Sequence, residues 1–351
     1  MAHPLLKDVP SLGRKIKLMH VCGTHQDTLV KHGLQALFDE VGVQIVQGPG
    51  CPVCVTTPME IEEARQLALA GKAITAFGDM MNVPGPGGSL FSARSEGADV
   101  RIVYSITDSV QMARKEPSKE FVFLGVGFET TAPSSAVILA KEPPANYSVL
   151  SCHRLVPPAL EAILRMGEVK LDGLIEPGHV SAIIGTEPYE PISSRWKVPQ
   201  VVAGFEPEDL LRAVAMLAAQ IKEGRAQVEN EYTRVVRREG NLKALKVMKE
   251  AFEPCDAKWR GFPLIKGSAL AIRPKYEQWD ASLRYEEILA PILGRDFGEP
   301  PGCLCGEVLR GVRDSKDCPL FGKGCSPENP VGPCMVSAEG SCNIAYRYRA
   351  E

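Results

Sequence analysis

Short apolar runs rich in β-branched residues recur along the first two thirds of the chain, roughly every 25–30 residues. Segments with helical periodicity separate most of them, and strands that alternate with helices form parallel sheets. The pattern predicts strands within residues 15–21, 43–47, 72–77, 100–105, 121–126, 147–151, 171–176 and 198–203. Such units either close into a single barrel or divide into two open, doubly wound sheets, and spacing alone does not decide between these folds.

Two of the predicted helices have clear sequence signals. One begins after Thr57, a residue that caps helix N-termini, and has Pro58 at its first position. Glu60 falls in its first turn, and Gly71 is expected to end it. The segment 207–225, PEDLLRAVAMLAAQIKEGR, has the clearest amphipathic pattern in the chain.

The division of the chain is indicated by its glycine-rich turns and by a change of character near residue 230. AFGDMMNVPG and GVGFETTAP are similar glycine-rich turns, and each follows a predicted strand. This weak internal similarity favours two lobes over a barrel. Beyond residue 230 the chain is first helical and highly charged, and then rich in glycine and cysteine. We therefore expect one α/β lobe at 1–118, a second at 119–230, and a smaller helical and cysteine-rich region at 231–351.

The composition is that of a soluble globular protein, with 351 residues, 44% hydrophobic and 24% charged. The formal net charge of −3 indicates no large basic surface for nucleic acid. Residues 1–17 contain no apolar run of the secretory type, and no apolar segment approaches the roughly 20 residues that a membrane-spanning helix needs. We expect a cytoplasmic protein that binds neither nucleic acid nor membrane.

The eleven cysteines are unevenly distributed, with three in the first 54 residues and six between residues 303 and 342. Only Cys152 and Cys255 lie between these groups, and Cys255 is expected to be structural. In a reducing compartment, clustered cysteines are more often metal ligands or catalytic thiols than structural disulfides. The two groups are therefore candidates for chemistry.

Glycine-rich motifs that contain Cys, His, Asp or Glu follow several predicted strands. In α/β sheets, ligands bind in the crevice outside the carboxyl ends of the strands. Although any one such turn can be simply a turn, the number of these motifs argues for a shared site. That site would gather Cys22, Thr24, His25, Cys51, Cys54, Asp79 and Glu129, and further His153 and His179.

Cys51 and Cys54 form a C-x-x-C in the stiff segment GPGCPVC, at residues 48–54. That spacing suits a redox dithiol or half of a soft-metal site. Cys22 offers a third thiolate, although a lone cysteine can also be a small buried apolar residue. Without His25, three thiolates are too few for a closed zinc site, so they fit an open site, a temporary metal site or a thiol relay.

The cysteine-rich tail offers four thiolates at Cys303, Cys318, Cys325 and Cys342, with Cys305 and Cys334 in addition. Iron–sulfur clusters take four cysteine ligands, often with a proline beside one of them, as Pro319 is here. Zinc also suits four thiolates, but the tail has no C-x-x-C pair and no histidine. The pattern favours the cluster, and zinc remains the main alternative.

Together these motifs resemble one family. CGTHQD, GPGCPVC, FGDMMNVPG, GFETTAP and CHRLVPPA, with the tail pattern CGEVLRG, DCPLFG and CSPENPVGPCMVS, resemble the hydrogenase maturation (expression/formation) protein HypD family over nearly the whole chain. The resemblance implies a scaffold with redox activity in NiFe-hydrogenase assembly. It pairs with the small chaperone HypC, and on that complex iron acquires two cyanides and one carbon monoxide, Fe(CN)2CO. HypE supplies the cyanide.

The resemblance also implies a fold and roles for individual residues. The fold is two similar doubly wound α/β lobes around a cleft, followed by a domain that carries a 4Fe-4S cluster. The essential cysteine falls on Cys22 and the paired cysteines on Cys51 and Cys54, which are the expected iron ligands. These three cysteines and His25 are the expected catalytic residues, with His25 within hydrogen-bond reach of a group bound to the Cys22 sulfur. The cluster ligands fall on Cys303, Cys318, Cys325 and Cys342, although Cys305 is an alternative to Cys303.

Two functions from different classes stay open. The first is a metallocentre assembly factor with a redox-active cluster and dithiol, which differs from a classical enzyme. The second is a stand-alone thiol–disulfide oxidoreductase that uses Cys51 and Cys54, with a structural zinc in the tail. The two differ in the metal they expect in the tail and in what the thiols act on.

Overall fold

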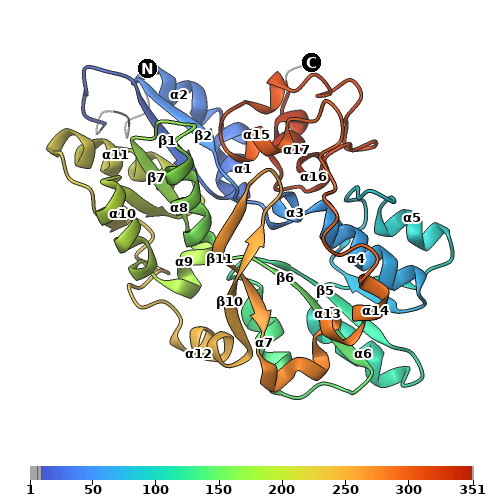
Figure 1. The fold of residues 1–351 in the computed structure, drawn as a ribbon. Coiled ribbons are helices and arrows are strands. Elements are labelled where there is room, and N and C mark those ends of the chain that lie inside the picture. The colour runs from blue at the N-terminus through green and yellow to red at the C-terminus, as the bar shows by residue number, and fades with distance from the viewer. Residues whose placement is uncertain (1–5, 7–8, 350–351) are drawn as a thin grey trace.

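The computed structural model describes residue 6 and residues 9–349, so residues 1–5 and 7–8 of the segment expected to lack a signal sequence fall outside it. All eight expected strands form (Figure 1). They are β1 (Ile16–His20), β2 (Val43–Gln47), β3 (Ala73–Ala76), β4 (Val100–Ile102), β5 (Phe121–Gly127), β6 (Tyr147–His153), β7 (Gly173–Pro177) and β8 (Gln200–Ala203).

The strands form two open sheets and not one closed barrel. The first sheet has the order β2-β1-β7-β8-β9, with β9 at Val228–Asn230, and the second has the order β4-β3-β5-β6. Every strand pair in both sheets is parallel. The expected α/β class with parallel sheets is therefore confirmed.

Sheet membership does not follow chain order. β1 and β2 pair with strands that come after residue 170, whereas β3 to β6 form the second sheet among themselves. The first sheet therefore takes strands from both of the lobes expected from the sequence. The limits 1–118, 119–230 and 231–351 stay a prediction as domain boundaries, because sheet membership alone does not define folding units.

The helices lie between the strands and in the C-terminal region. They are α1 (Gly23–Lys31), α2 (Leu34–Glu40), α3 (Pro52–Val55), α4 (Pro58–Leu69), α5 (Leu90–Ser95), α6 (Ile106–Lys115), α7 (Ala132–Ala140), α8 (Val156–Met166), α9 (Gly178–Ile184), α10 (Glu190–Trp196), α11 (Pro207–Glu223), α12 (Leu242–Ala251), α13 (Ala281–Arg284), α14 (Glu286–Leu289), α15 (Cys305–Leu309), α16 (Pro333–Val336) and α17 (Ser341–Arg347). None in the described part of the chain is both long and apolar enough to cross a membrane.

The two helices with clear sequence signals form as expected. Thr57 caps α4 by accepting a hydrogen bond from the Glu60 amide, and the Thr57 amide donates one to the Glu60 carboxylate in a capping box. Gly71 follows the helix with φ of 83°, a left-handed conformation that glycine adopts readily. α11 buries its apolar stripe on β7 and β8.

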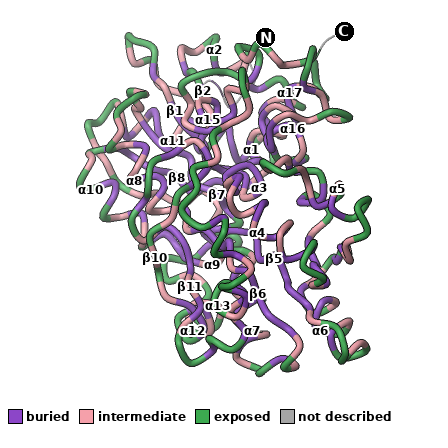
Figure 2. Tube along the Cα trace, turned by 45° about the vertical axis from the view of Figure 1, so that its right-hand side comes forward, coloured by how far each residue is buried: buried purple, intermediate pink, exposed green. Residues whose placement is uncertain are grey.

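The core lies between the sheets and their helices. β5 is buried along its whole length, as its purple trace in Figure 2 shows. One apolar cluster extends from the second sheet through α3 to the tail, and it includes Cys51, Cys54, Cys305 and Cys334. The cysteine-rich tail is therefore packed into the main core and is not an appendage.

An antiparallel hairpin that the sequence pattern did not predict joins the parts. It consists of β10 (Phe252–Lys258) and β11 (Leu264–Ile272), and β11 also contacts the end of β6 through a bridge between Arg154 and Ala269. Figure 1 shows the hairpin at the centre of the molecule and the tail, in red, beside α1 and α3. The helix expected after residue 230 is confined to α12.

Both parallel sheets have a switch point at which the chain changes direction across the sheet. In the first sheet it lies between β1 and β7, and in the second between β3 and β5. Ligands of open α/β sheets bind at such points, outside the carboxyl ends of the strands. CGTHQD and EPGHVS follow the first strand pair, and FGDMMNVPG and GFETTAP follow the second. The motifs singled out from the sequence therefore stand where ligands bind.

Candidate metal and redox site

Cys22 lies at the first switch point, where β1 turns into α1. It is the N-cap residue of α1 in an extended conformation, and its side chain is only 6% exposed. The next amide, that of Gly23, donates a hydrogen bond of 3.3 Å to the carbonyl of Gly50. The turn after β1 is thus tied directly to the turn after β2.

Gly50 is the residue that allows this close approach. A Cβ atom at this position would lie 2.1 Å from the backbone nitrogen of Cys22 and 2.2 Å from the carbonyl carbon of Val21. No side chain fits there, so glycine is required by the packing of backbone on backbone. The consequence is that Cys51, the next residue, is held beside the Cys22 turn.

Cys51 and Cys54 are joined by a disulfide. Cys51 is the N-cap of the short helix α3, and its sulfur accepts a hydrogen bond of 3.2 Å from the Cys54 amide. Both side chains are completely buried. The structure therefore presents the C-x-x-C in its oxidised form, and its redox activity stays a prediction.

The surroundings of the Cys22 sulfur set its protonation. Burial raises the pKa of the thiol to about 11, and the nearby charge of Glu339 adds to the rise. The amides of His25 and Thr24 and the Thr24 hydroxyl point toward the sulfur and oppose it. At neutral pH the group is a thiol, so binding a metal ion would release its proton.

Glu339 is a neighbour of this site that sequence reasoning missed. Its Cβ would lie 2.5 Å from a Cβ placed on Gly23, so the tail loop rests on the turn after Cys22. Asp79, which was expected at the site, is close enough for its charge to raise the pKa of the Glu339 carboxyl, in addition to the effect of burial. Glu339 and Asp79, which are far apart in the sequence, thus place two acidic side chains at the edge of the site.

His25 is buried beside Cys22, but its ring is already engaged. Its Nε2 lies 2.9 Å from the carbonyl oxygen of Gly204, and burial lowers the pKa of the ring to about 3. A neutral ring that donates from Nε2 carries no proton on Nδ1. His179 lies nearby and stacks on Phe205 at 3.8 Å between ring centroids. The His25 ring is therefore neutral, with Nε2 at the Gly204 carbonyl and with Nδ1 buried without a hydrogen-bond partner among the residues described.

Two buried carboxyl groups form a second feature that the sequence analysis only touched. Glu129 and Glu176 are almost fully buried, and burial raises the pKa of each carboxyl to about 8. Neither oxygen of Glu176 has a hydrogen-bond partner among the residues described. Besides burial, the charges of Glu176, Glu129 and Cys22 raise the pKa of the Tyr189 phenol, which places all four groups near one another.

His153 does not join the site. Its Nε2 lies 2.8 Å from the hydroxyl of Ser135 on α7, and its ring meets Phe252 of β10 edge-on. Burial lowers the pKa of His153 to about 4, so the ring is neutral. It is a packed, hydrogen-bonded residue of the second sheet.

The six tail cysteines all line one small cavity. Its other walls are mostly apolar, formed by Leu304, Val308, Leu320, Phe321 and Met335. Burial raises the pKa of Cys303 to about 12 and also raises that of Cys342. The fold brings six irregularly spaced thiols together around one cavity, and a cluster held by thiolates would need such an arrangement.

The cavity has open space beside one of its sulfurs. Gly332 lines it, and a Cβ there would lie 2.8 Å from the Cys303 sulfur, so glycine keeps the space beside the sulfur open. As the side chains stand, no three His, Cys, Asp or Glu residues in the described part of the chain are arranged to hold a single metal ion. A 4Fe-4S cluster binds its four thiolates through separate irons. The donor set suits such a cluster, and its presence stays a prediction.

Cys305 and Cys334 form a close pair within this set, with their sulfurs 2.8 Å apart. Both are almost completely buried, and their helices α15 and α16 pack against α3, which carries Cys54. The pairing leaves Cys303, Cys318, Cys325 and Cys342 as the other four thiols around the cavity. No local pattern predicts this pair, since its members are 29 residues apart.

Arg260, at the tip of the β10–β11 hairpin, ties α3 to the tail. Its backbone amide donates to the Val55 carbonyl at 2.9 Å, and its Nε donates to the Thr56 carbonyl at 2.8 Å. Its Nη1 donates to Glu299 at 2.8 Å, although the Arg260 side chain itself is fully buried. Gly261 follows, with its backbone pressed on Gly306 of α15. One turn thus holds the C-x-x-C helix against the segment that leads to the tail cysteines.

Comparison with known proteins identifies the family. The chain matches the HypD family model, described as the hydrogenase formation hypA family, over residues 2–349. A protein of Methanocaldococcus jannaschii named for hydrogenase expression and formation is 49% identical over 338 residues, which cover 95% of this chain and 92% of that protein. Hydrogenase maturation factors HypD of Cupriavidus necator and Azotobacter vinelandii are 42% and 41% identical, over 96% and 95% of this chain and 90% of each relative. The chain therefore belongs to the HypD family of hydrogenase maturation factors.

Proposed function

We propose that this protein is the cytoplasmic scaffold on which Fe(CN)2CO is assembled during NiFe-hydrogenase maturation. It acts together with a HypC-like chaperone, and a HypE-like protein delivers the cyanide. Family membership supports the maturation role. The observation that carries the proposal is the convergence of the Cys22 turn and the Cys51–Cys54 turn, locked together at Gly50.

In this proposal Cys22 holds the iron that is the cargo. Low-valent iron with cyanide and carbon monoxide ligands prefers soft thiolate donors. The amides of Thr24 and His25 and the Thr24 hydroxyl point toward the same sulfur and are available to cyanide nitrogens. The His25 ring is assigned to positioning, because its Nε2 lies at the Gly204 carbonyl.

Cys51 and Cys54 switch between disulfide and dithiol in this scheme. Opening the disulfide takes up two electrons and two protons and gives two thiols. The pair Cys305 and Cys334 can supply both, because closing these thiols into a disulfide releases two electrons and two protons. Packing of α15 and α16 on α3 supports such an exchange. Reduced Cys51 and Cys54 then offer two further thiolates beside Cys22.

Cys303, Cys318, Cys325 and Cys342 would hold the 4Fe-4S cluster. When bound, the cluster supplies one-electron chemistry next to the Cys305 and Cys334 thiols. The chain itself provides the apolar wall that shields the cavity and the open space at Gly332.

A stand-alone thiol–disulfide oxidoreductase is the second candidate. The disulfide at Cys51 and Cys54 favours it, because the C-x-x-C is in the form that oxidises a substrate thiol. A substrate protein would need access to one of these sulfurs, and both side chains are 0% exposed. Burial therefore favours a relay within the scaffold.

Anaerobic purification with the small chaperone, followed by infrared spectroscopy and metal analysis, tests the proposal. We expect bands of iron-bound cyanide and carbon monoxide, with about four further irons and matching sulfide per chain. Stoichiometric zinc without sulfide, together with no such bands, would leave the oxidoreductase as the better account.

A further inference from the structure

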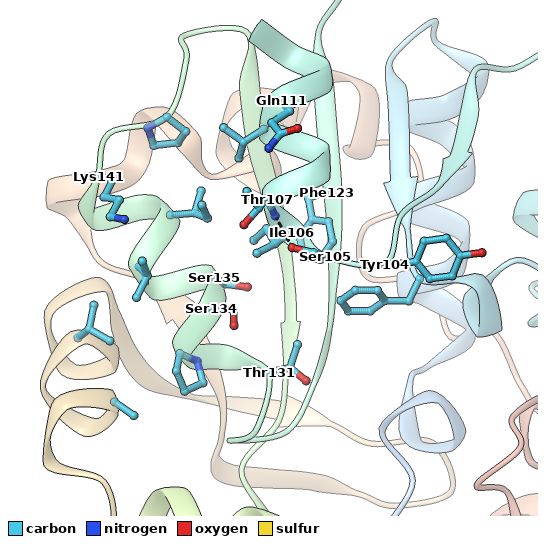
Figure 3. Close-up of a pocket in the computed structure, with 18 of the residues that line it drawn as sticks. Tyr104, Ser105, Ile106, Thr107, Gln111, Phe123, Thr131, Ser134, Ser135 and Lys141 are labelled. Carbon is cyan, nitrogen blue, oxygen red and sulfur yellow. Dashed lines mark hydrogen bonds between the residues drawn. The ribbon is translucent and has the colours of Figure 1, made fainter. Parts of the chain in front are cut away.

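A groove on the second sheet is unused by the metal and redox site. It encloses about 820 Å³ and lies between α6 and α7, with the start of α12 as a third wall. Figure 3 shows Thr107 and Gln111 of α6 facing Ser134 and Ser135 of α7 across it. Its floor, Phe123 of β5, is fully buried, and its exposed or half-buried apolar walls are formed by Val137, Ile138 and Val247.

The two helices that flank the groove are placed by the topology of the sheet. α6 and α7 each connect one parallel strand to the next, so the two helices run in the same direction. α6 has 10 residues, which corresponds to a length of about 15 Å. In Figure 3, Thr131 lies at one end of α7 and Lys141 at the other. Tyr104 stands near the groove with its side chain 93% exposed.

The charges that line the groove are all positive. Arg114, Lys141 and Lys243 contribute to its walls, and no carboxylate does among the residues the structure describes. None of these three cations makes an ion pair within the described ranges, 6 and 9–349. The neighbouring cations Arg101 and Lys119 are by contrast both paired with carboxylates.

Helix dipoles add to this positive potential at the N-terminal ends of the helices, whereas Arg114 and Lys141 lie at the C-terminal ends of α6 and α7, where the dipole is negative. Ser105, Thr131 and Asn241 are the N-cap residues of α6, α7 and α12, and all three line the groove. Lys243 stands in the first turn of α12, where the positive end of the dipole disfavours a cation. Lys243 thus lies where the dipole of its own helix disfavours a positive charge. The positive charge of the groove also contrasts with the net charge of −3 of the whole chain.

We propose that the α6–α7 groove is the docking site for an acidic amphipathic helix of a partner protein. The apolar walls at Val137, Ile138 and Val247 take the apolar face of such a helix, and the three cations meet its carboxylates. A length of about 15 Å accommodates roughly three turns, with anchors at i, i+3 or i+4, and i+7. The inference does not depend on iron assembly at Cys22.

A docking helix fits better than an added strand. Strand addition needs a free sheet edge with unpaired backbone groups. β5, which forms the floor, is paired on one side with β3 and on the other with β6. The exposed ring of Tyr104 is the kind of aromatic anchor that dominates interface energies.

The test begins with a photo-crosslinking amino acid at position 104 of the full chain in its native host. The control carries the same group at Leu264, which is 57% exposed on the hairpin. Crosslinked peptides are identified by mass spectrometry, and the peptide found at position 104 is then synthesised. Its dissociation constant is measured by fluorescence anisotropy with the purified protein.

We expect a peptide of net negative charge with apolar residues at helical spacing. Lys141→Glu/Lys243→Glu should weaken its binding by about tenfold or more, and added salt should weaken binding to the unchanged protein. The control Lys266→Glu, a cation outside the groove, should leave the affinity unchanged. Circular dichroism of the double variant checks that the fold is kept.

Four results would overturn the proposal. They are crosslinking at position 104 no stronger than at position 264, crosslinks only to a second copy of this chain, crosslinks to a phosphorylated small molecule or lipid, and an affinity unaffected by the double charge reversal. Each would show that the groove holds something other than an acidic helix, or nothing.

Discussion

Replacing Gly50 by alanine tests the contact on which the arrangement of the metal site depends. The new Cβ would lie 2.1 Å from the backbone nitrogen of Cys22, whereas ordinary contact begins at 3.4 Å. The obstructing atoms are backbone atoms, so they cannot rotate away as a side chain would. The turn that carries Cys51 must therefore move away from Cys22 by about 1.3 Å.

That displacement has two measurable consequences. Overpacking of this kind costs roughly 1–3 kcal/mol, which corresponds to a melting temperature lower by roughly 1–4 °C for 351 residues. Metal sites need their ligands within about 0.5 Å of the productive geometry. We therefore expect the Gly50→Ala protein to fold and keep its tail cluster, but to lose most of the infrared bands of iron-bound cyanide and carbon monoxide.

Differential scanning fluorimetry and infrared spectroscopy of the anaerobic complex are the assays. Gly298→Ala is a matched control, because a Cβ at Gly298 would meet no atom within 4 Å. The control should behave as the unchanged protein does in both assays. An unshifted melting temperature together with full bands in Gly50→Ala would show that the Cys22 and Cys51 turns are not locked as described.

Three further predictions follow from the buried polar groups and the tail. Arg260→Gln should lower the free energy of unfolding by about 2–4 kcal/mol in denaturant titrations. Arg260→Lys should recover only part of this loss, because one ammonium cannot bond both the Thr56 carbonyl and Glu299. An unchanged denaturation midpoint for Arg260→Gln would contradict the bridging role of Arg260. Burial raises the folded-state pKa of Glu176 to about 8, above its unfolded value, so its favourable contribution is present at acid pH and is lost as pH rises through 8. The stability of Glu176→Gln should therefore fall less steeply between pH 5 and 8, by up to about 1.4 kcal/mol per pH unit, and parallel curves would refute this. Cys303→Ser should remove the iron and sulfide of the tail whereas Cys305→Ser should not, as metal analysis will show; the reverse result would make Cys305 the ligand.

Local sequence signals were sufficient for the strands and for the ends of α4. Thr57, Glu60 and Gly71 act through neighbouring backbone groups, so their effect can be predicted from the sequence near them. The pairing of β1 with β7 joins segments about 150 residues apart, and no local pattern specifies it. The hairpin was missed because only Phe252 of the seven residues of β10 is buried, so the strand has no run of buried apolar positions, and because it contains Pro254.

The site was predicted in part for the same reason. Cys22 and Cys51 follow strands that lie side by side in a parallel sheet, so strand order alone suggests that they meet. Glu339 and Arg260 reach the site through tertiary packing, and neither belongs to a motif at a strand end. The His25 ring was expected to serve the bound group, but its partner Gly204 is 179 residues away and is visible only in three dimensions.

The measurement that tests the central claim most directly is infrared spectroscopy of Cys22→Ala, purified anaerobically with the small chaperone. The fold and the iron and sulfide of the tail should be retained, because Cys22 lies outside the tail cavity. The bands of iron-bound cyanide and carbon monoxide should disappear, because the thiolate that retains such iron is gone. Bands at full strength in this variant would contradict the account and move the assembly site to Cys51 and Cys54 or to the partner.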